Sequence, residues 1–229
     1  MTLYSEGLQS AIASGIHTAD KVSPDGLYLS ASESIPGHGV TTFIDAKTLK
    51  PNGTQFQDVY VWSIAANRVA SSAFRGEKGV VLVGELIKQI PEYETDCKYV
   101  RPSFITSELL AVLGCERLDV VSLTAGKTFT STLKGADAFF AAVSRDGSRF
   151  AVIQVDCSPG DPPSLSLERV IVFDVTRQKP VFATVISDLK GSTTGASSGV
   201  ALSPDGASLA INTAGVVRLF ALQVQRDSR

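Results

Sequence analysis

The chain has little of several residue types on which common functional sites depend. Its 229 residues include two histidines, three cysteines, one methionine and one tryptophan. His17 and His38 lie near no cysteine and no pair of carboxylates, so no zinc-ligand pattern is present. The net charge of −2 leaves no basic face for nucleic acid. No run of about 18 apolar residues occurs, and a transmembrane helix is therefore not expected.

The start of the chain also lacks the pattern of a secretion signal. Residues 1–20 read MTLYSEGLQSAIASGIHTAD, with Glu6 and without a basic start before an apolar core. Such a stretch is not a signal peptide. We expect a cytoplasmic protein, or a periplasmic or secreted one from which a leader has been removed.

The odd cysteine count leaves two interpretations open. Cys97, Cys115 and Cys157 are three unpaired thiols in the favoured interpretation. In the alternative, one disulfide joins Cys97 to Cys115 or Cys115 to Cys157, which would imply an oxidising compartment.

What is present is a globular composition arranged in short apolar runs. Hydrophobic residues make up 44% of the chain and charged residues 19%, which excludes a disordered class. A chain of this length can hold one large core or about four to five small sheets.

The clearest arrangement of runs is Gly199–Leu222, GVALSPDGASLAINTAGVVRLFAL. Its first apolar run ends at the turn Ser203-Pro204-Asp205-Gly206, in which proline presets φ and glycine accepts a positive φ. Leu209 and Ile211 then alternate with small or polar residues, the period of a half-buried strand. With a further break at Ala214-Gly215, the stretch predicts a three-stranded antiparallel meander.

Earlier parts of the chain repeat this pattern. Asp-Gly turns recur at Ser23–Gly26 and Ser144–Gly147, and a weaker copy without the Asp-Gly pair spans Ser103–Leu123. The predicted third strands begin at Val59, Leu118 and Val170, and the predicted fourth strands are Val69–Phe74, Phe129–Leu133 and Val181–Ile186. Repeated four-stranded antiparallel units of about 40–60 residues are typical of β-propellers and related arrays.

At these turns and strands the sequence resembles the WD40/YVTN-like β-propeller superfamily. The resemblance covers most of residues 18–222 and is to its loose bacterial WD40-like type, because the Gly-His and Trp-Asp signatures are absent and Trp62 precedes Ser63. It implies an all-β array of about four to five four-stranded blades. We favour a partial propeller over a ring that closes with fewer blades or pairs with another chain.

The expected organisation has three parts. Residues 1–17 form an N-terminal segment, from which Thr2–Tyr4 is a candidate closing strand for the last blade. Residues 18–222 form the repeat domain, and residues 223–229 a C-terminal tail. Long connections are expected at 33–58, which includes a strand-like stretch at Val40–Asp45, and at 158–168, each between the second and third strands of its unit, so both should lie on one face. Residues 79–97 are expected as a strand and an irregular excursion, forming all or part of a degenerate blade.

Motifs that suggest catalysis lack the context that the chemistry requires. Gly195–Gly199 fits the G-x-S-x-G pattern but precedes a strand, with both histidines upstream. Gly126-Lys127-Thr128 lacks the first glycine of a phosphate-binding loop, since Val121 is there, and Gly37-His38-Gly39 lacks a third glycine. Two groups of acids could bind a hard cation but are expected to be solvated loop acids: Glu92, Glu94 and Asp96, and Asp156 with Asp161. Asn52-Gly53 is expected to form a turn. The aspartates of the Asp-Gly turns, Asp25, Asp146 and Asp205, are expected to stabilise the turn backbone.

We therefore expect no catalytic, cofactor-binding or metal-binding residues and no cofactor. The favoured function is a non-catalytic scaffold that binds a protein or peptide through the face carrying 33–58 and 158–168, with self-association through open edge strands as a further expectation. One alternative is a propeller enzyme, since some similar propellers resemble lactonases or quinoprotein dehydrogenases with a central-channel site. The other is a truncated fragment of a longer propeller.

Overall fold

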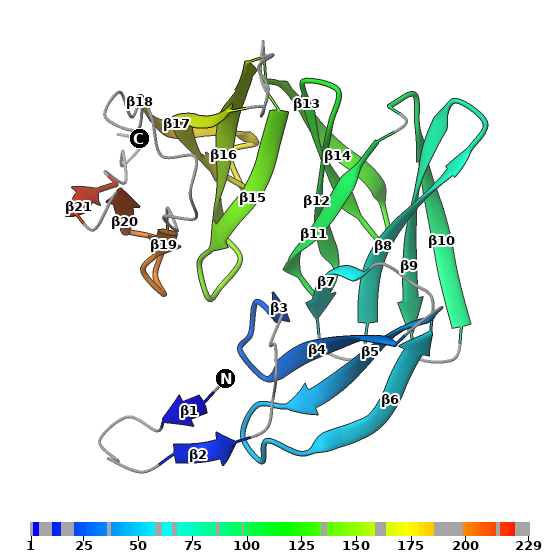
Figure 1. Cartoon of the computed structure of the whole chain (residues 1–229). Helices are drawn as coiled ribbons and strands as arrows, with labels where there is room; N and C mark the ends of the chain where they lie inside the picture. The colour runs from blue at the N-terminus through cyan, green and yellow to red at the C-terminus, as the bar shows by residue number, and fades with distance from the viewer. Residues whose placement is uncertain are drawn as a thin grey trace. The chain divides into compact units, whose positions relative to one another are not determined.

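Strands and turns account for the described part of the chain. The computed structural model describes residues 2–4, 11–14, 21–35, 38–57, 61–65, 68–85, 88–97, 99–133, 137–158, 164–185, 199–213 and 216–222. No helix occurs among these residues (Figure 1), which confirms the predicted all-β class. Accordingly, the described residues contain no helix that is long and apolar enough to cross a membrane.

The strands form small antiparallel sheets in which sequence neighbours pair. Two compact units divide the chain at Leu110, inside strand β12. The strands up to that point form a two-stranded hairpin, two four-stranded sheets, and the start of a third: β1 (Thr2–Tyr4), β2 (Ala11–Ser14); β3 (Lys21–Val22), β4 (Tyr28–Ile35), β5 (His38–Asp45), β6 (Pro51–Gln57); β7 (Val61–Ala65), β8 (Arg68–Arg75), β9 (Lys78–Glu85), β10 (Lys88–Thr95); and β11 (Arg101–Thr106).

The later strands follow the same sequential order. The third sheet has the order β11-β12-β13-β14, the fourth is β15-β16-β17-β18, and the last described sheet has three strands, β19-β20-β21. Their bounds are β12 (Leu109–Gly114), β13 (Arg117–Ser122), β14 (Gly126–Thr132); β15 (Asp137–Val143), β16 (Arg149–Ser158), β17 (Ser164–Asp174), β18 (Lys179–Val185); and β19 (Gly199–Leu202), β20 (Ser208–Thr213), β21 (Val216–Ala221).

Each unit has its own apolar packing between neighbouring sheets. In the first unit Phe43 of β5 packs with Ile64 and Val69 of the next sheet, all nearly inaccessible to solvent. In the second unit the fourth and last sheets share a cluster, formed by Ala151, Val170, Val172, Leu209, Ile211 and Leu222. Burying alternate side chains of adjacent sheets is what removes this apolar area from water and stabilises the stack.

The β16–β17 hairpin extends beyond the strands beside it. The pairing of β15 with β16 reaches Val155, and the pairing of β17 with β18 begins at Arg169. Beyond Val155 the ladder continues through Asp156–Ser158 and Ser164–Ser166, which pair only with one another in the described ladder. The predicted long connection at 158–168 is therefore wrong in most of its length, and residues 159–163 lie outside the described part.

The predicted connection at 33–58 is also wrong, because it holds two strands. β5 and β6 occupy most of it, and β4 pairs with β5 up to Ile35 and His38. Pro36-Gly37 and Pro51-Asn52-Gly53 suggested a loop, but the first falls outside the described residues and the second begins β6. Asn52-Gly53 is thus part of a strand and not the expected turn.

This shift changes the assignment of the second sheet. The strand expected as the third of unit one is β7, the first strand of the next sheet, and Val69–Phe74 belongs to its second strand, β8. Residues 79–97 supply β9 and β10 and complete that sheet. The expected third strands from Leu118 and Val170, and the fourth strands near Phe129 and Val181, are confirmed as β13, β17, β14 and β18.

The N-terminal strand has a different partner from the expected one. Thr2–Tyr4 pairs with Ala11–Ser14 in a two-stranded hairpin, and no described strand pairs with the outer side of β21. Because the first strand finds its partner nearby in the sequence, pairing it required closure of only a short loop. Thr2–Tyr4 is therefore not a strand of the β19–β21 sheet.

Candidate functional site

The three Ser-x-Asp-Gly turns have the same internal hydrogen bonds. In each turn the glycine has a positive φ, 71°, 69° or 67°, and donates its N–H to the serine carbonyl at 2.8–2.9 Å. The aspartate Oδ1 accepts from the serine hydroxyl and, at 3.0 Å, from the backbone N–H two residues later; the donors are Ser23 and Leu27, Ser144 and Ser148, and Ser203 and Ala207. The expected structural role of these aspartates is confirmed.

Hydrogen bonding also lowers the pKa of two of these carboxyls. For Asp146 the largest cause is the backbone N–H of Ser148, followed by the Ser144 hydroxyl. For Asp205 the largest cause is the Ser203 hydroxyl, followed by the N–H of Ala207. Both hydrogen bonds favour the charged form of the acceptor, so these aspartates are poor candidates for a general acid.

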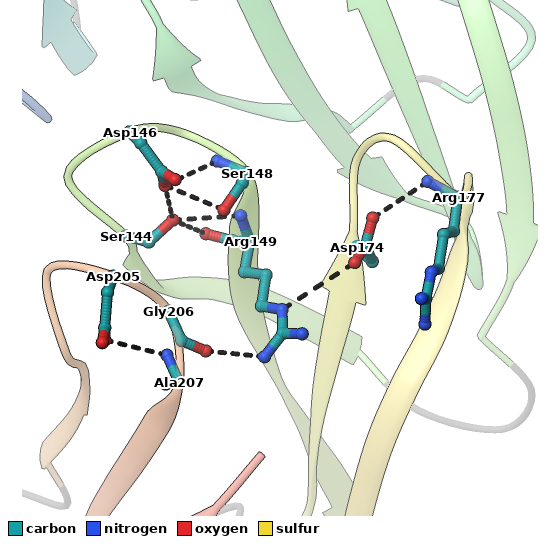
Figure 2. A network of polar contacts seen from close by, with 9 residues as sticks. All are labelled: Ser144, Asp146, Ser148, Arg149, Asp174, Arg177, Asp205, Gly206 and Ala207. Atoms are coloured by element: carbon teal, nitrogen blue, oxygen red, sulfur yellow. Dashed lines mark hydrogen bonds and ion pairs between the residues drawn. The ribbon is translucent and has the colours of Figure 1, made fainter. Parts of the chain in front are cut away.

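A buried arginine connects two of the turns within the second unit. Arg149 is 5% exposed, and its Nη1 donates to the carbonyl oxygen of Gly206 at 2.8 Å. Its Nε lies 3.8 Å from Oδ2 of Asp174, whose Oδ1 accepts from the N–H of Arg177 at 2.9 Å (Figure 2). The guanidinium thus links the β15–β16 turn, the end of β17 and the β19–β20 turn.

Two further contacts tighten this link between neighbouring sheets. The N–H of Arg145 donates to the carbonyl of Pro204 at 3.0 Å. A Cβ added to Gly206 would lie 3.1 Å from Cδ of Arg149, so glycine suits this position both by its positive φ and by the space it leaves. The polar contacts in Figure 2 therefore stabilise the packing of the β15–β18 sheet against the β19–β21 sheet.

The remaining sequence candidates have structural surroundings where they are described. Lys127 and Thr128 follow Gly126 in β14, and the Thr128 hydroxyl donates to the carbonyl of Val120. Glu94 pairs with Lys78 at 2.5 Å on neighbouring strands. Residues 195–198 of the G-x-S-x-G pattern, Gly37 and Asp161 lie outside the described residues. Among the side chains that are described, no three or more His, Cys, Asp or Glu residues gather as a metal site.

The cysteines follow the alternative in which two of them are oxidised. Cys97 and Cys115 are both disulfide-bonded. Cys97 lies four residues before β11, and Cys115 directly follows β12 in the β12–β13 turn, where its φ is positive at 49°. The favoured interpretation of three unpaired thiols is therefore wrong for these two residues.

Several apolar side chains are exposed to solvent, which the sequence motifs did not predict. They fall at the first Asp-Gly turn, on two outer strands and before β11, and comprise Val22, Leu27, Tyr99, Val185, Val216, Val217 and Leu219. Leu27 is 58% exposed immediately after Gly26, where the other two turns have Ser148 and Ala207. That difference between the turns was visible in the sequence, but the exposure of the strand residues depended on which strand lies at the edge.

Comparisons with known proteins place these sheets among solved folds. No protein-family model matches the chain, and no curated protein matches its sequence. The β-propeller domain of Cps50 (Swd1) from Myceliophteria thermophila is similar with a TM-score of 0.54 and 15% identity, over 98% of this chain and 71% of that one. TolB from Acinetobacter baumannii gives a TM-score of 0.56 with 12% identity, over 93% of this chain and 54% of TolB.

Hsv2 from Kluyvelomyces marxianus is a third similar structure, with a TM-score of 0.51 and 12% identity, over 89% of this chain and 59% of Hsv2. The chain has a WD40-like β-propeller fold. It spans little more than half the length of TolB and Hsv2. At 12–15% identity the likeness concerns the propeller fold alone, which hosts many unrelated functions.

Within this propeller fold the last strands of the sheets differ in residue composition. The four-stranded sheets end in strands that contain proline or an exposed lysine, namely Pro51 in β6, Pro91 in β10, Lys127 in β14, and Lys179 with Pro180 in β18. The three-stranded sheet ends in β21, VVRLFA, which contains neither residue type. Proline and charged residues, above all lysine, discourage pairing at sheet edges, and β21 contains only Arg218 of these, so it is less protected than the last strands of the other sheets.

Proposed function

We propose that this propeller is a non-catalytic module that binds a protein or peptide partner. The observation that carries the proposal is the exposed apolar surface at the first Asp-Gly turn. Val22 precedes this turn and Leu27 follows it, and both side chains are more than half exposed. Exposed apolar surface that is contiguous is a feature of protein interaction sites, and these two side chains flank one turn.

The polar groups of the turns support the same proposal, because they hydrogen-bond to one another and to the backbone. The aspartates of the three turns accept hydrogen bonds from their own backbones and serines, and Arg149 is bound to Gly206 and Asp174. A catalytic site needs nucleophile, base and electrostatic groups that converge on a free space. In the described residues these polar groups converge on one another.

The surface expected from the sequence, formed by connections at 33–58 and 158–168, is replaced in this proposal. Most of those residues are in strands, so they supply little loop for a partner to contact. The three Ser-x-Asp-Gly turns share one backbone conformation, and the first differs from the other two in having a large apolar residue, Leu27, directly after its glycine. A loop residue that varies on a rigid scaffold is a common way to adapt the scaffold to a ligand.

The proposal is tested by placing a photo-crosslinking amino acid at position 27 of the full chain in cells of the source organism. We expect crosslinks to a defined protein, identified by mass spectrometry, and their loss when Val22→Ser is added. A crosslinker at position 185 is the matched control, because Val185 is similarly exposed at 63% but lies on another sheet. Equal products from both positions would contradict a partner site at the turn.

The enzyme alternative is separated by metal analysis of the purified protein together with a hydrolase activity screen. We expect no stoichiometric metal and no turnover. A metal bound at one equivalent, with activity that disappears on chelation, would favour an enzyme over a binding module.

A further inference from the structure

The outer strand of the last sheet has one exposed apolar face and one face that is packed only in part, since Val216 on that second face is 55% exposed. Along β21, Val217, Leu219 and Ala221 share one face, since side chains alternate along a strand. Leu219 is 77% exposed and Val217 is 60% exposed. On the other face Phe220 packs against Phe182 of the neighbouring sheet, with ring centroids 5.3 Å apart.

The same strand also has one backbone edge that is not paired with any described strand. β21 pairs with β20 on one side through all six of its residues, and it ends the order β19-β20-β21. Its outer backbone groups therefore have no strand partner among the described residues. An edge strand that contains no proline or lysine, and in β21 only one charged residue, Arg218, is a template for pairing with another strand.

We propose that β21 pairs with β21 of a second copy of this chain, antiparallel, around a two-fold axis at Leu219. In an antiparallel pair, directly opposite residues point to the same face of the sheet. Leu219 then lies opposite Leu219 of the second copy, Val217 opposite Ala221, and Arg218 opposite Phe220. The two three-stranded sheets become one six-stranded sheet with a continuous apolar face.

The sequence of β21 favours this register over one of its two neighbours. Moving the axis by one residue toward the N-terminus, to Arg218, would place Arg218 opposite Arg218 of the second copy, and like charges directly opposite each other destabilise a strand pair. Moving it the other way, to Phe220, brings no like charges together, and the cysteine test below distinguishes that register. With the axis at Leu219 no pair joins like charges. A net charge of −2 for the whole chain adds little repulsion between copies. A two-fold contact of this kind is also the commonest form of self-association in proteins.

This interface is separate from the partner site proposed at the first turn, and either can fail without the other. The test measures the mass of the full chain by sedimentation equilibrium over a concentration series. We expect a monomer–dimer equilibrium for the unaltered protein. Leu219→Lys should raise the dissociation constant at least about tenfold, because it places a lysine at the centre of the strand pair.

Val185→Lys is the matched control, because it introduces the same charge at an exposed valine of β18, whose edge already contains Lys179 and Pro180. It should leave the dimer unchanged. A protein that stays monomeric at the highest concentration, or a dimer equally affected by both variants or by neither, would overturn the proposal.

A second measurement fixes the register. Leu219→Cys should form an intermolecular disulfide under mild oxidation, because directly opposite Cα atoms lie about 4.5–5.5 Å apart. Val217→Cys should not, because four residues of strand would separate the two thiols by about 13 Å. Crosslinking of Val217→Cys as readily as Leu219→Cys would overturn the axis at Leu219.

Discussion

Gly206, in the third turn, is suited to its position for two separate reasons. Its φ of 67° belongs to the left-handed region, and its missing side chain leaves room for Arg149. At Gly126 only the first reason applies, because its φ is 78° and an added Cβ would meet nothing within 4 Å. The pair thus separates backbone strain from side-chain crowding within one unit.

We expect Gly206→Ala to destabilise the protein more than Gly126→Ala. Both variants carry the cost of a non-glycine residue at positive φ, about 1–2 kcal/mol. Gly206→Ala adds the displacement of Arg149 from its preferred side-chain conformation, about 0.5–1.5 kcal/mol. Urea denaturation of the two variants measures the difference, and equal losses of unfolding free energy would contradict the crowding argument.

At the scale of elements, the contact between the fourth and last sheets combines an apolar cluster with one buried guanidinium. Leu209 and Ile211 of β20 pack with Val170 and Val172 of β17, while Arg149 bonds to the turn that precedes β20. The cluster stabilises the contact by burying apolar surface area. The arginine fixes the relative orientation of the two turns, because its hydrogen bond to Gly206 requires a particular geometry.

We expect Arg149→Met to lower the free energy of unfolding by about 2 kcal/mol, the scale of a hydrogen bond involving a charged group. Asp174 would keep its hydrogen bond from the N–H of Arg177, which limits the loss. Arg145→Met is the control, because the Arg145 side chain is exposed and its link to Pro204 is made by the backbone. A control that loses as much stability would contradict the role given to Arg149.

The sequence predicted the elements where short apolar runs are separated by short turns, and it failed where the connection contained residues that disfavour strands. The meander from Gly199 and the strand from Val170 were found in units with an Asp-Gly turn, and the strand from Leu118 was found in a unit without one, because each is a short apolar run bounded by polar turns. β6 was missed because Pro51, Asn52 and Gly53 disfavour strands locally, and pairing with β5 overrides that preference.

The Arg149 contacts and the exposed side chains could not be predicted from the sequence for a different reason. The role of Arg149 depends on Gly206 and Asp174, which are distant in the sequence and meet only when neighbouring sheets pack. Leu219 reads as a strand residue whether it is covered or not. Exposure of that side chain, 77%, depends on how the sheets pack face to face, which is not a property of the local pattern.

For the whole molecule, the oxidation state of the cysteines links the structure to its surroundings. Cys97 and Cys115 are disulfide-bonded in a chain that has three cysteines, so Cys157 is the remaining one. Disulfides persist mainly in oxidising compartments. We therefore propose an extracytoplasmic location for the protein.

We expect thiol titration of the denatured, unreduced protein to detect one thiol per chain, and three after reduction, because two of the three cysteines are oxidised. Replacing both Cys97 and Cys115 with serine should leave the unreduced value at one. Three thiols in freshly purified, unreduced protein would contradict the disulfide and remove the argument about compartment.

The β16–β17 hairpin runs three residue pairs past Val155, through Asp156, Cys157 and Ser158, without a third strand in the described ladder. An excursion of this kind can carry foreign sequence, since insertions at a hairpin tip leave the ladder behind it intact. A short epitope or dye-binding peptide placed between Ser158 and Ser164 would thus give the protein a handle for surface attachment or single-molecule pulling.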